Sequence, residues 1–350
     1  MNRLRRLACV ACLALHTLLI SQSCWADYIG RDPSIIPGGT KRVRDNGTLA
    51  FFYDAGLPQS IRDQIETYGE AHAVTPDLTK TYDFVNTLGF SNFVIGSNTD
   101  TGQYLAGNTF ATNGYIPGNE NYINQARQPL ISKSNDLFVL SQVPFTQVGQ
   151  DYWQIKHYDL TTNTFVESIN PPAPGRIDDI AFREVGPFGA GDQIFFSTPL
   201  GVFKTTRPSP TFVSKTFSPL PLLTLPLVAG ADGNIAVGPD NLLYVRNFAN
   251  GDVQRYNSTT GAFIDTFISH VSFPNLGTIQ FGVDGNLHAY GGAGDILKFS
   301  GSTGALLATT HTNLLNGRIT FVPVPEPAAV MLALTGVSFL VGRRAKNSRR

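Results

Sequence analysis

The chain contains few sulfur-containing residues and few charged ones. Of its 350 residues, 3 are cysteine and 2 are methionine, and charged residues make up 15%. The three cysteines, Cys9, Cys12 and Cys24, all lie near the N-terminus, in a segment with the features of a removable export signal. We therefore expect the rest of the chain to have no disulfide, thiol nucleophile or cysteine metal site.

The N-terminal segment has the three parts of a secretory signal peptide. Three arginines precede an apolar run over residues 7–20. Small residues, Cys24 and Ala26, stand at the −3 and −1 positions of a cut between Ala26 and Asp27. We expect Sec-type export machinery to carry the chain out of the cytoplasm and the signal to be cleaved there. A lipoprotein signal around Cys24 is the weaker alternative, because Ser21 stands where such signals usually have Leu.

The C-terminus combines a short motif, an apolar run and a basic end. In order, these parts are Val324, Pro325, Glu326 and Pro327, then residues 328–341, then a basic end that starts with Arg343 and Arg344. Each proline disfavours helical geometry in the residue before it, so the motif should be extended and exposed. The apolar run would span about 21 Å as a helix, short of the ~30 Å hydrocarbon core. Snorkelling arginines and local thinning of the bilayer can cover this difference, with the basic end on the cytoplasmic side.

This order of parts resembles the PEP-CTERM sorting signal of Gram-negative bacteria. The resemblance implies that an exosortase recognises residues 324–327 and processes the tail, so that residues 328–341 anchor the precursor in the inner membrane only transiently. It also implies association with extracellular polysaccharide matrix. As in a GPI signal, the mature protein would keep no membrane span. The alternative, a buried core helix followed by a solvated basic tail, is disfavoured because the run has no polar face.

The zero net charge of the whole chain conceals an acidic body. Without the two terminal segments, residues 27–324 carry 18 Lys and Arg against 25 Asp and Glu, a net charge of −7. This balance favours solubility and argues against a nucleic-acid or anionic-lipid surface. We therefore expect no nucleic-acid partner. The PEP-CTERM resemblance implies an exopolysaccharide or another surface protein as the partner instead.

The body contains repeated units of about 44 residues. Gly238 and Gly282 are 44 residues apart, and Gly261 and Gly304 are 43 apart. Each unit contains short strand-like runs separated by turn residues, and looser copies lie upstream, including one at residues 153–165. Units of this length with several strands are typical of propeller blades, which bury both faces only by packing against neighbouring blades.

The last two units, residues 238–256 and 282–299, resemble NHL-type repeats. We predict an all-β fold, a six- or seven-bladed β-propeller of four-stranded blades, flanked by the signal helix and the C-terminal hydrophobic helix. The predicted organisation is a signal peptide (1–26), a propeller body (27–322, with the clearest repeats at 136–310) and a sorting signal (323–350).

Three local expectations can be tested against a structure. Residues 318–322 should form a strand that shares one composite blade with N-terminal strands such as 48–53. A short amphipathic helix, capped by Ser60, is expected because Ile61, Ile65 and Tyr68 would share one face. Trp153 should pack between blades, and one residue of each pair Phe51-Phe52 and Phe195-Phe196 should do the same while the other lies at a rim or edge.

No local pattern predicts a catalytic, cofactor-binding or metal-binding residue. The five histidines outside the signal segment are more than ten residues apart, and they are His72, His157, His270, His288 and His311. His157 occupies the repeat position of Arg255, and His288 that of Tyr244, so both are interpreted as packing or surface residues. The Asp-containing segments at 240–241 and 284–286 lack the later Glu of a calcium loop and are interpreted as turns.

Two classes of function remain open from the sequence. The first is an exported, non-enzymatic propeller that acts as a binding or structural module at the cell surface. The alternative is a hydrolase or lyase of the gluconolactonase-like type, with a divalent cation held by inward-facing carboxylates in the central channel. The first is favoured, because no acidic residue recurs at a fixed repeat position apart from the turn Asp.

Overall fold

All regular elements in the described part of the chain are β-strands. The computed structural model describes residues 26–31, 40–43, 49–52, 65–75, 79–87, 92–98, 104–105, 110–112, 127–132, 134–142, 153–170, 177–184, 192–198, 201–206, 222, 235–247, 251–269, 278–282, 284–291, 294–312 and 320–323. Residues 28–322 form one compact unit. The other unit, residues 1–27 with 323–350, lies almost wholly outside the described residues.

The strands form six sheets within the described residues. The strands of five sheets follow the chain order, and in the first sheet β23 lies beside β1. The first sheet contains β23 (Thr320–Pro323), β1 (Ala26–Arg31), β2 (Thr40–Val43) and β3 (Leu49–Phe52). The second contains β4 (Ile65–Val74), β5 (Lys80–Thr87), β6 (Asn92–Asn98) and β7 (Phe110–Thr112). The third contains β8 (Arg127–Ile131), β9 (Asp136–Gln142), β10 (Trp153–Asp159) and β11 (Thr164–Ile169).

The last two of the remaining three sheets contain the two units that resemble NHL-type repeats. The fourth contains β12 (Asp179–Arg183), β13 (Gln193–Thr198) and β14 (Gly201–Thr206). The fifth contains β15 (Ile235–Val237), β16 (Leu242–Arg246), β17 (Val253–Asn257) and β18 (Phe263–Ile268). The sixth contains β19 (Ile279–Phe281), β20 (Leu287–Tyr290), β21 (Asp295–Phe299) and β22 (Leu306–His311). Five sheets therefore have the four strands expected, and the fourth sheet has three within the described residues.

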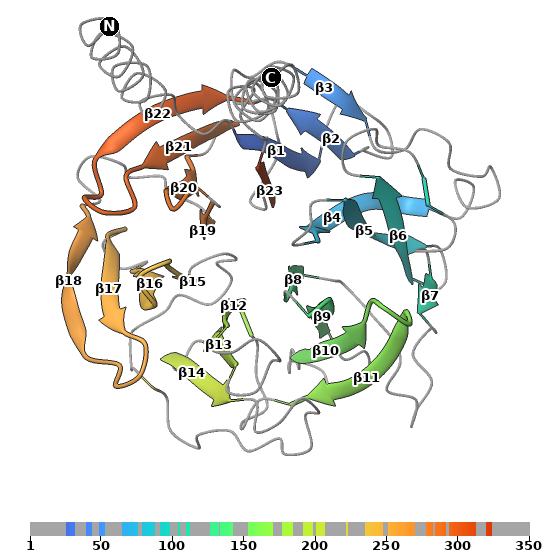
Figure 1. Cartoon of the computed structure of the whole chain (residues 1–350), viewed down its shortest axis with the longest axis horizontal. Helices are drawn as coiled ribbons and strands as arrows, with labels where there is room; N and C mark the ends of the chain where they lie inside the picture. The colour runs from blue at the N-terminus through green and yellow to red at the C-terminus, as the bar shows by residue number, and fades with distance from the viewer. Residues whose placement is uncertain are drawn as a thin grey trace, which may run out of the picture. The chain divides into compact units, whose positions relative to one another are not determined.

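Successive sheets of the body lie side by side around a common centre (Figure 1). The first strands of neighbouring sheets contact one another in chain order, β4 with β8, β8 with β12, β12 with β15, and β15 with β19. Within each sheet, strands that are consecutive in the chain pair in antiparallel fashion, as short turns between them require. A series of antiparallel sheets in which each sheet contacts the next is typical of a β-propeller. The number of blades, six or seven, stays a prediction.

The sheet formed by β1, β2, β3 and β23 joins both ends of the body. β23 comes from the last described segment and lies next to β1, and β3 falls within the expected strand at residues 48–53. The expectation that residues near 318–322 share one sheet with N-terminal strands is confirmed.

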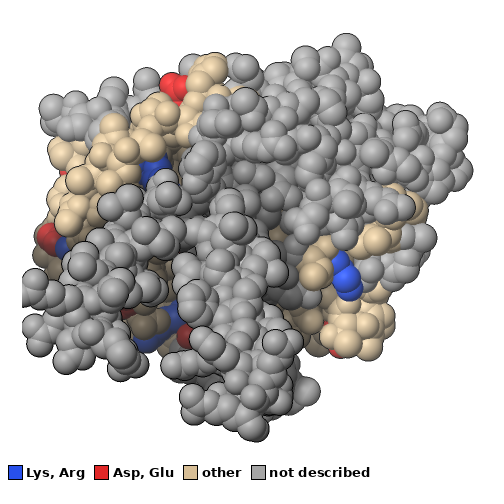
Figure 2. Space-filling view, turned by 45° about the horizontal axis from the view of Figure 1, so that its top comes forward, with Lys and Arg blue, Asp and Glu red and all other residues tan. Residues whose placement is uncertain are grey.

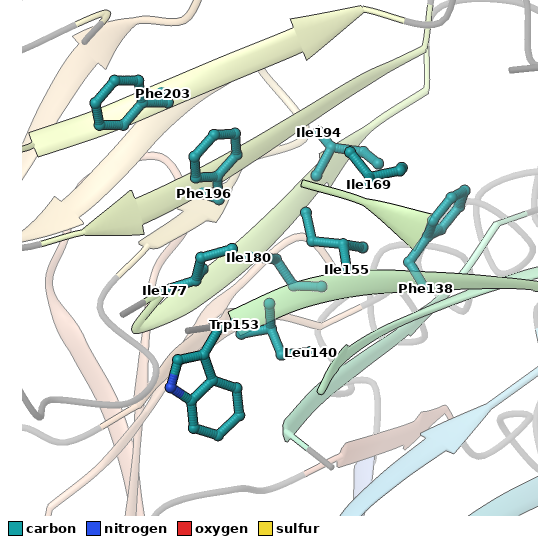
Figure 3. Packing of buried hydrophobic residues seen from close by; sticks show 10 residues of the cluster. All are labelled: Phe138, Leu140, Trp153, Ile155, Ile169, Ile177, Ile180, Ile194, Phe196 and Phe203. Atoms are coloured by element: carbon teal, nitrogen blue, oxygen red, sulfur yellow. The ribbon is translucent and has the colours of Figure 1, made fainter. Parts of the chain in front are cut away.

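The core is divided into clusters that lie between successive sheets. One cluster joins the third and fourth sheets and contains Phe138, Leu140, Trp153, Ile155, Ile169, Ile177, Ile180, Ile194, Phe196 and Phe203 (Figure 3). Similar clusters join the second sheet to the third, the fourth to the fifth, and the fifth to the sixth. Trp153 is 2% exposed, so the expectation that it packs between blades is confirmed. Burial of each large apolar side chain stabilises the fold by about 1.5–3 kcal/mol.

Two sequence expectations were wrong. Ile65 and Tyr68, expected on a helix, lie in strand β4, which pairs with β5. Phe195 and Phe196 were expected to divide between an interior and a rim position, but both are fully buried. Because the fourth sheet is covered on both faces, Phe195 packs towards the fifth sheet and Phe196 towards the third. Residues 60–64 and the side chains of Phe51 and Phe52 lie outside the described residues.

The turns have the geometry that the repeats predict. Gly285, Asn241 and Asn135 have φ between +62° and +72° in the turn that precedes the second strand of their sheets. Gly261, Gly304 and Asn163 have φ between +54° and +73° in the turn between the third and fourth strands. Asn and Gly are the residues that adopt this left-handed conformation most readily. The same two turns therefore recur in three sheets.

Candidate functional site

The sorting and membrane residues predicted from the sequence lie outside the described part of the chain. This holds for Val324, Pro325, Glu326 and Pro327, for Arg343 and Arg344, and for the apolar run at 328–341. Among the described residues, no helix is long and apolar enough to cross a membrane. Ala26 and Asp27, on either side of the expected signal cleavage, begin strand β1. The register of β1 with β2 starts at Tyr28, so a cut before Asp27 would leave the pairs from Tyr28 to Arg31 intact.

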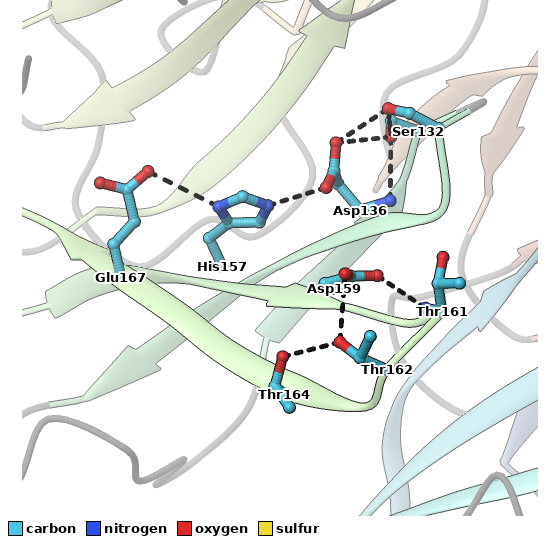
Figure 4. Close-up of polar contacts among 9 residues, drawn as sticks. Ser132, Asp136, His157, Asp159, Thr161, Thr162, Thr164 and Glu167 are labelled. Carbon is cyan, nitrogen blue, oxygen red and sulfur yellow. Dashed lines mark hydrogen bonds and ion pairs between the residues drawn. The ribbon is translucent and has the colours of Figure 1, made fainter. Parts of the chain in front are cut away.

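A cluster of buried ionisable side chains surrounds His157 in the described body. His157 lies in β10 opposite Phe138 of β9, and the two rings stack with centroids 4.7 Å apart. Its Nε2 is 3.0 Å from Asp136 Oδ1, and its Nδ1 is 3.5 Å from Glu167 Oε1 (Figure 4). The imidazole is 2% exposed, and the two carboxylates are 12% and 10% exposed. The cluster therefore places one ring between two acids in the interior.

The two carboxylates control the charge of His157. Burial alone would lower the pKa of His157, but hydrogen bonds and charge from Asp136 and Glu167 outweigh it, so the pKa is raised. Asp136 is held in turn by the hydroxyl of Ser134 at 2.8 Å and by Ser132, whose Oγ also accepts from the Asp136 backbone N–H at 3.1 Å. The imidazole is thus favoured in its protonated form.

This arrangement does not suit nucleophilic catalysis. A catalytic histidine needs one ring nitrogen facing a nucleophile, whereas both nitrogens of His157 face carboxylates. The hydroxyls of Ser132 and Ser134 contact Asp136. The cluster is therefore a buried ion group at the junction of the third and fourth sheets, where Phe138 also stacks on Phe182 at 5.5 Å.

A second buried ion group occupies the equivalent part of the sixth sheet. Asp284 Oδ2 is 2.9 Å from Lys298 Nζ, and Asp284 Oδ1 is 3.5 Å from His288 Nε2. Burial alone would raise the pKa of Asp284, but hydrogen bonds from His288, Asn286 and Lys298 lower it far below its usual range. The carboxylate also accepts from the Asn286 backbone N–H at 3.0 Å, as expected for a turn Asp. Asp240 makes the same turn contact with Leu242 N at 3.1 Å.

A third ion pair belongs to the fifth sheet. Arg255 lies opposite Tyr244 and donates to Asp265 of β18 through Nε, at 2.7 Å from Oδ1, and through Nη2 to Oδ2. The guanidinium carbon is 5.0 Å from the centre of the Phe267 ring. Tyr244 donates to Asp240 at 2.8 Å, and burial followed by this hydrogen bond raises the pKa of Tyr244 to about 12.

The remaining histidines are dispersed. His288 lies opposite Lys298 in β20, His72 lies opposite Asp83 in β4, and the exposed His311 is 2.8 Å from Asp295. His270 falls outside the described residues. Within the described residues, no group of three or more His, Cys, Asp or Glu side chains could hold a metal ion. On the face shown in Figure 2, described basic and acidic side chains are scattered and do not form one patch.

The repeat alignment predicted the strand positions of the histidines, but it did not predict the acids that contact them. Glu167 follows Phe165 by two residues, as Asp265 follows Phe263, so the repeat alignment contained the signal for an acid in the fourth strand. Asp136 gives a weaker signal, because it begins a strand, whereas Asp240 and Asp284 lie in the preceding turn.

The comparisons with known proteins identify a fold and no family. No family model matches the sequence, and no curated protein sequence matches it. Among solved structures, the chain is similar to TolB from Acinetobacter baumannii, with 13% sequence identity and a TM-score of 0.53. The match covers 86% of this chain and 67% of that chain. At this identity the likeness concerns the fold alone. The described body is an all-β protein of the propeller type.

Proposed function

We propose that this chain is an exported protein whose propeller body acts as a binding or structural module at the cell surface or in the extracellular matrix. The observation that carries the proposal is the order of parts at the C-terminus, in which residues 324–327 precede an apolar run and a basic end. In this proposal an exosortase processes the tail, and residues 328–341 hold the precursor in the inner membrane until then.

The body provides independent support for a binding or structural role. It has no cysteine and an acidic net charge, both of which suit a protein that functions outside the cytoplasm without disulfides. Its described ionisable groups are used in contacts that join strands and sheets, as His157, Arg255 and Asp284 illustrate. No described contact specifically favours the hydrolase or lyase alternative.

The proposal predicts a defined change of mass at both ends of the protein. In a Gram-negative host with an active exosortase, the secreted form should begin at Asp27 and lack the segment from 328 to 350. Intact-mass spectrometry of the secreted protein measures both ends together. A secreted product that still ends at Arg350 would contradict the proposal.

A matched pair of tail variants separates recognition of the motif from general damage to the tail. Replacing Pro325, Glu326 and Pro327 by alanine should leave the full-length precursor in the membrane fraction, because the extended recognition segment is lost. Ser348→Ala, which also changes the tail, should be processed as the unchanged protein is. A host without the exosortase should retain both forms in the membrane. Equal processing of the two variants would show that the motif is not recognised.

A further inference from the structure

One position in the repeat carries a cation in four successive sheets. The cation belongs to the third strand and lies opposite an aromatic or imidazole ring of the second strand. The four pairs are Phe138 with His157, Phe195 with Lys204, Tyr244 with Arg255, and His288 with Lys298. Three of these cations contact a carboxylate: His157, Arg255 and Lys298. Lys204 is the exception.

Lys204 contacts two neutral groups of the neighbouring sheet. Its Nζ donates to the backbone carbonyl of Thr259 at 3.1 Å and to that of Ser258 at 3.4 Å. These two residues form the turn between β17 and β18, so the contact crosses from the fourth sheet to the fifth. In the third and fifth sheets the fourth strand supplies one acidic partner, Glu167 or Asp265. Within the described residues the fourth sheet has no such strand.

A second cation, Arg183 at the end of β12, reaches the same turn. Its Nη1 donates to Ser258 Oγ at 3.1 Å and to Gln193 Oε1 at 3.4 Å, and its Nε donates to Asn241 Oδ1 at 3.2 Å. All of these acceptors are neutral. Arg183 and Lys204 therefore converge on Ser258 without any carboxylate among their contacts in the described structure.

The two cations are close enough to affect each other. Burial, and then the charge of Arg183, lowers the pKa of Lys204. The nearby acid Asp240 is already engaged by the Tyr244 hydroxyl and the Leu242 N–H. Both cations are half-exposed, and Asn241 and Thr259 beside them are exposed, so the group is open to solvent. Two neighbouring cations in an acidic body, with neutral acceptors only, are complementary to an anion with more than one oxygen.

We propose that Arg183 and Lys204, together with the turn at Ser258 and Thr259, form a binding site for an oxyanionic group, a carboxylate or a sulfate. The group belongs either to a free anion or to an acidic polysaccharide. The inference rests on the proposed binding role, to which it adds a ligand class, but its test does not involve the tail. If the protein did not bind sulfate, the predicted change of mass would still stand. If the mass did not change, sulfate binding could still be measured.

The test uses inorganic sulfate as the probe and the full chain in neutral detergent. Thermal unfolding is followed as sulfate replaces chloride at constant ionic strength, because a ligand that binds the folded state raises the unfolding temperature. The site variants are Arg183→Gln and Lys204→Gln. Lys80→Gln is the matched control, because it removes one half-exposed cation from β5, in another sheet. Each site variant should weaken sulfate binding by about tenfold or more, and the control should bind as the unchanged protein does.

A second arm distinguishes the source of the oxyanion. Retention on immobilised polygalacturonate, with neutral dextran as the reference, should be lost in Arg183→Gln and kept in Lys80→Gln if the group is carried by a polymer. Sulfate binding without retention on the polymer would assign the site to a free anion. No response of the unchanged protein to sulfate, or an equal response of all four proteins, would overturn the inference.

Discussion

Replacing His157 by glutamine should lower the free energy of unfolding by about 3–5 kcal/mol at pH 6, which is the range for removing one partner of a buried ion pair. The substitution leaves Asp136 and Glu167, which lie 3.0 Å and 3.5 Å from the ring nitrogens, buried without a cation between them. Equilibrium urea unfolding followed by circular dichroism measures the loss. A change below about 1 kcal/mol, typical of a surface substitution, would show that the cluster does not stabilise the fold.

The effect of this substitution should depend on pH. The pKa of His157 is raised in the folded protein because its two carboxylates outweigh the effect of burial. The histidine therefore contributes its full stabilisation below its unfolded pKa of about 6.5, and the contribution is lost as pH rises through the higher folded pKa. The difference in unfolding free energy between the unchanged protein and His157→Gln should shrink over that interval.

His157→Lys provides a charge-retaining control for this pH dependence. Lysine already occupies the equivalent position of the sixth sheet as Lys298, so the repeat accommodates it. The variant keeps a cation between the carboxylates, and lysine does not normally titrate near neutral pH. Its stability should therefore lack the decline that histidine introduces. If His157→Lys showed the same decline, the titrating group would be a different residue.

The repeats allowed the strand positions of individual residues to be predicted from the sequence. Equivalent positions of the units indicated that His157 matches Arg255 and that His288 matches Tyr244, and the strand registers confirm both matches. Each histidine is buried, as a packing residue would be. The acids were harder to predict, because their contacts cross between strands. Glu167 meets His157 only when β11 pairs with β10.

The N-terminal part of the body shows where local patterns fail. Ile65 and Tyr68 have the spacing of a helix face, but three apolar residues over eight positions are too few to define a period. Pairing of β4 with β5 decides the local structure instead. Likewise, the apparent conflict of Phe195 beside Phe196 disappears because the fourth sheet has a hydrophobic neighbour on each face.

The Arg183 and Lys204 group could not be predicted from either residue alone. The strand registers, and not the sequence, place Lys204 at the repeat position of Arg255, and the acid that Arg255 contacts comes from a fourth strand. The two cations are 21 positions apart in sequence and meet only at the turn that contains Ser258. Convergence of this kind arises from the packing of one sheet against the next.

Replacing Gly304 by alanine should also destabilise the protein strongly, by about 3 kcal/mol or more. Gly304 has φ +71°, a conformation that costs an alanine about 1–2 kcal/mol. In addition, a Cβ at this position would lie 2.2 Å from the backbone carbonyl oxygen of Phe267. That oxygen belongs to β18 of the fifth sheet, whereas Gly304 belongs to a turn of the sixth. A rigid backbone atom cannot move aside, so the two sheets would have to separate.

Gly285 provides the matched control for this steric contact. Its φ is +72°, but a Cβ there would lie 3.8 Å from its nearest neighbour, Pro239 Cγ. Gly285→Ala should therefore lose only the conformational term of about 1–2 kcal/mol. Gly285→Asn should lose less still, because Asn135 and Asn241 adopt φ +62° in the equivalent turns of two other sheets. Urea unfolding of the three variants would test this order. Equal losses for Gly304→Ala and Gly285→Ala would mean that backbone conformation alone sets the cost, and that the approach of the turn to β18 does not limit the spacing of the two sheets.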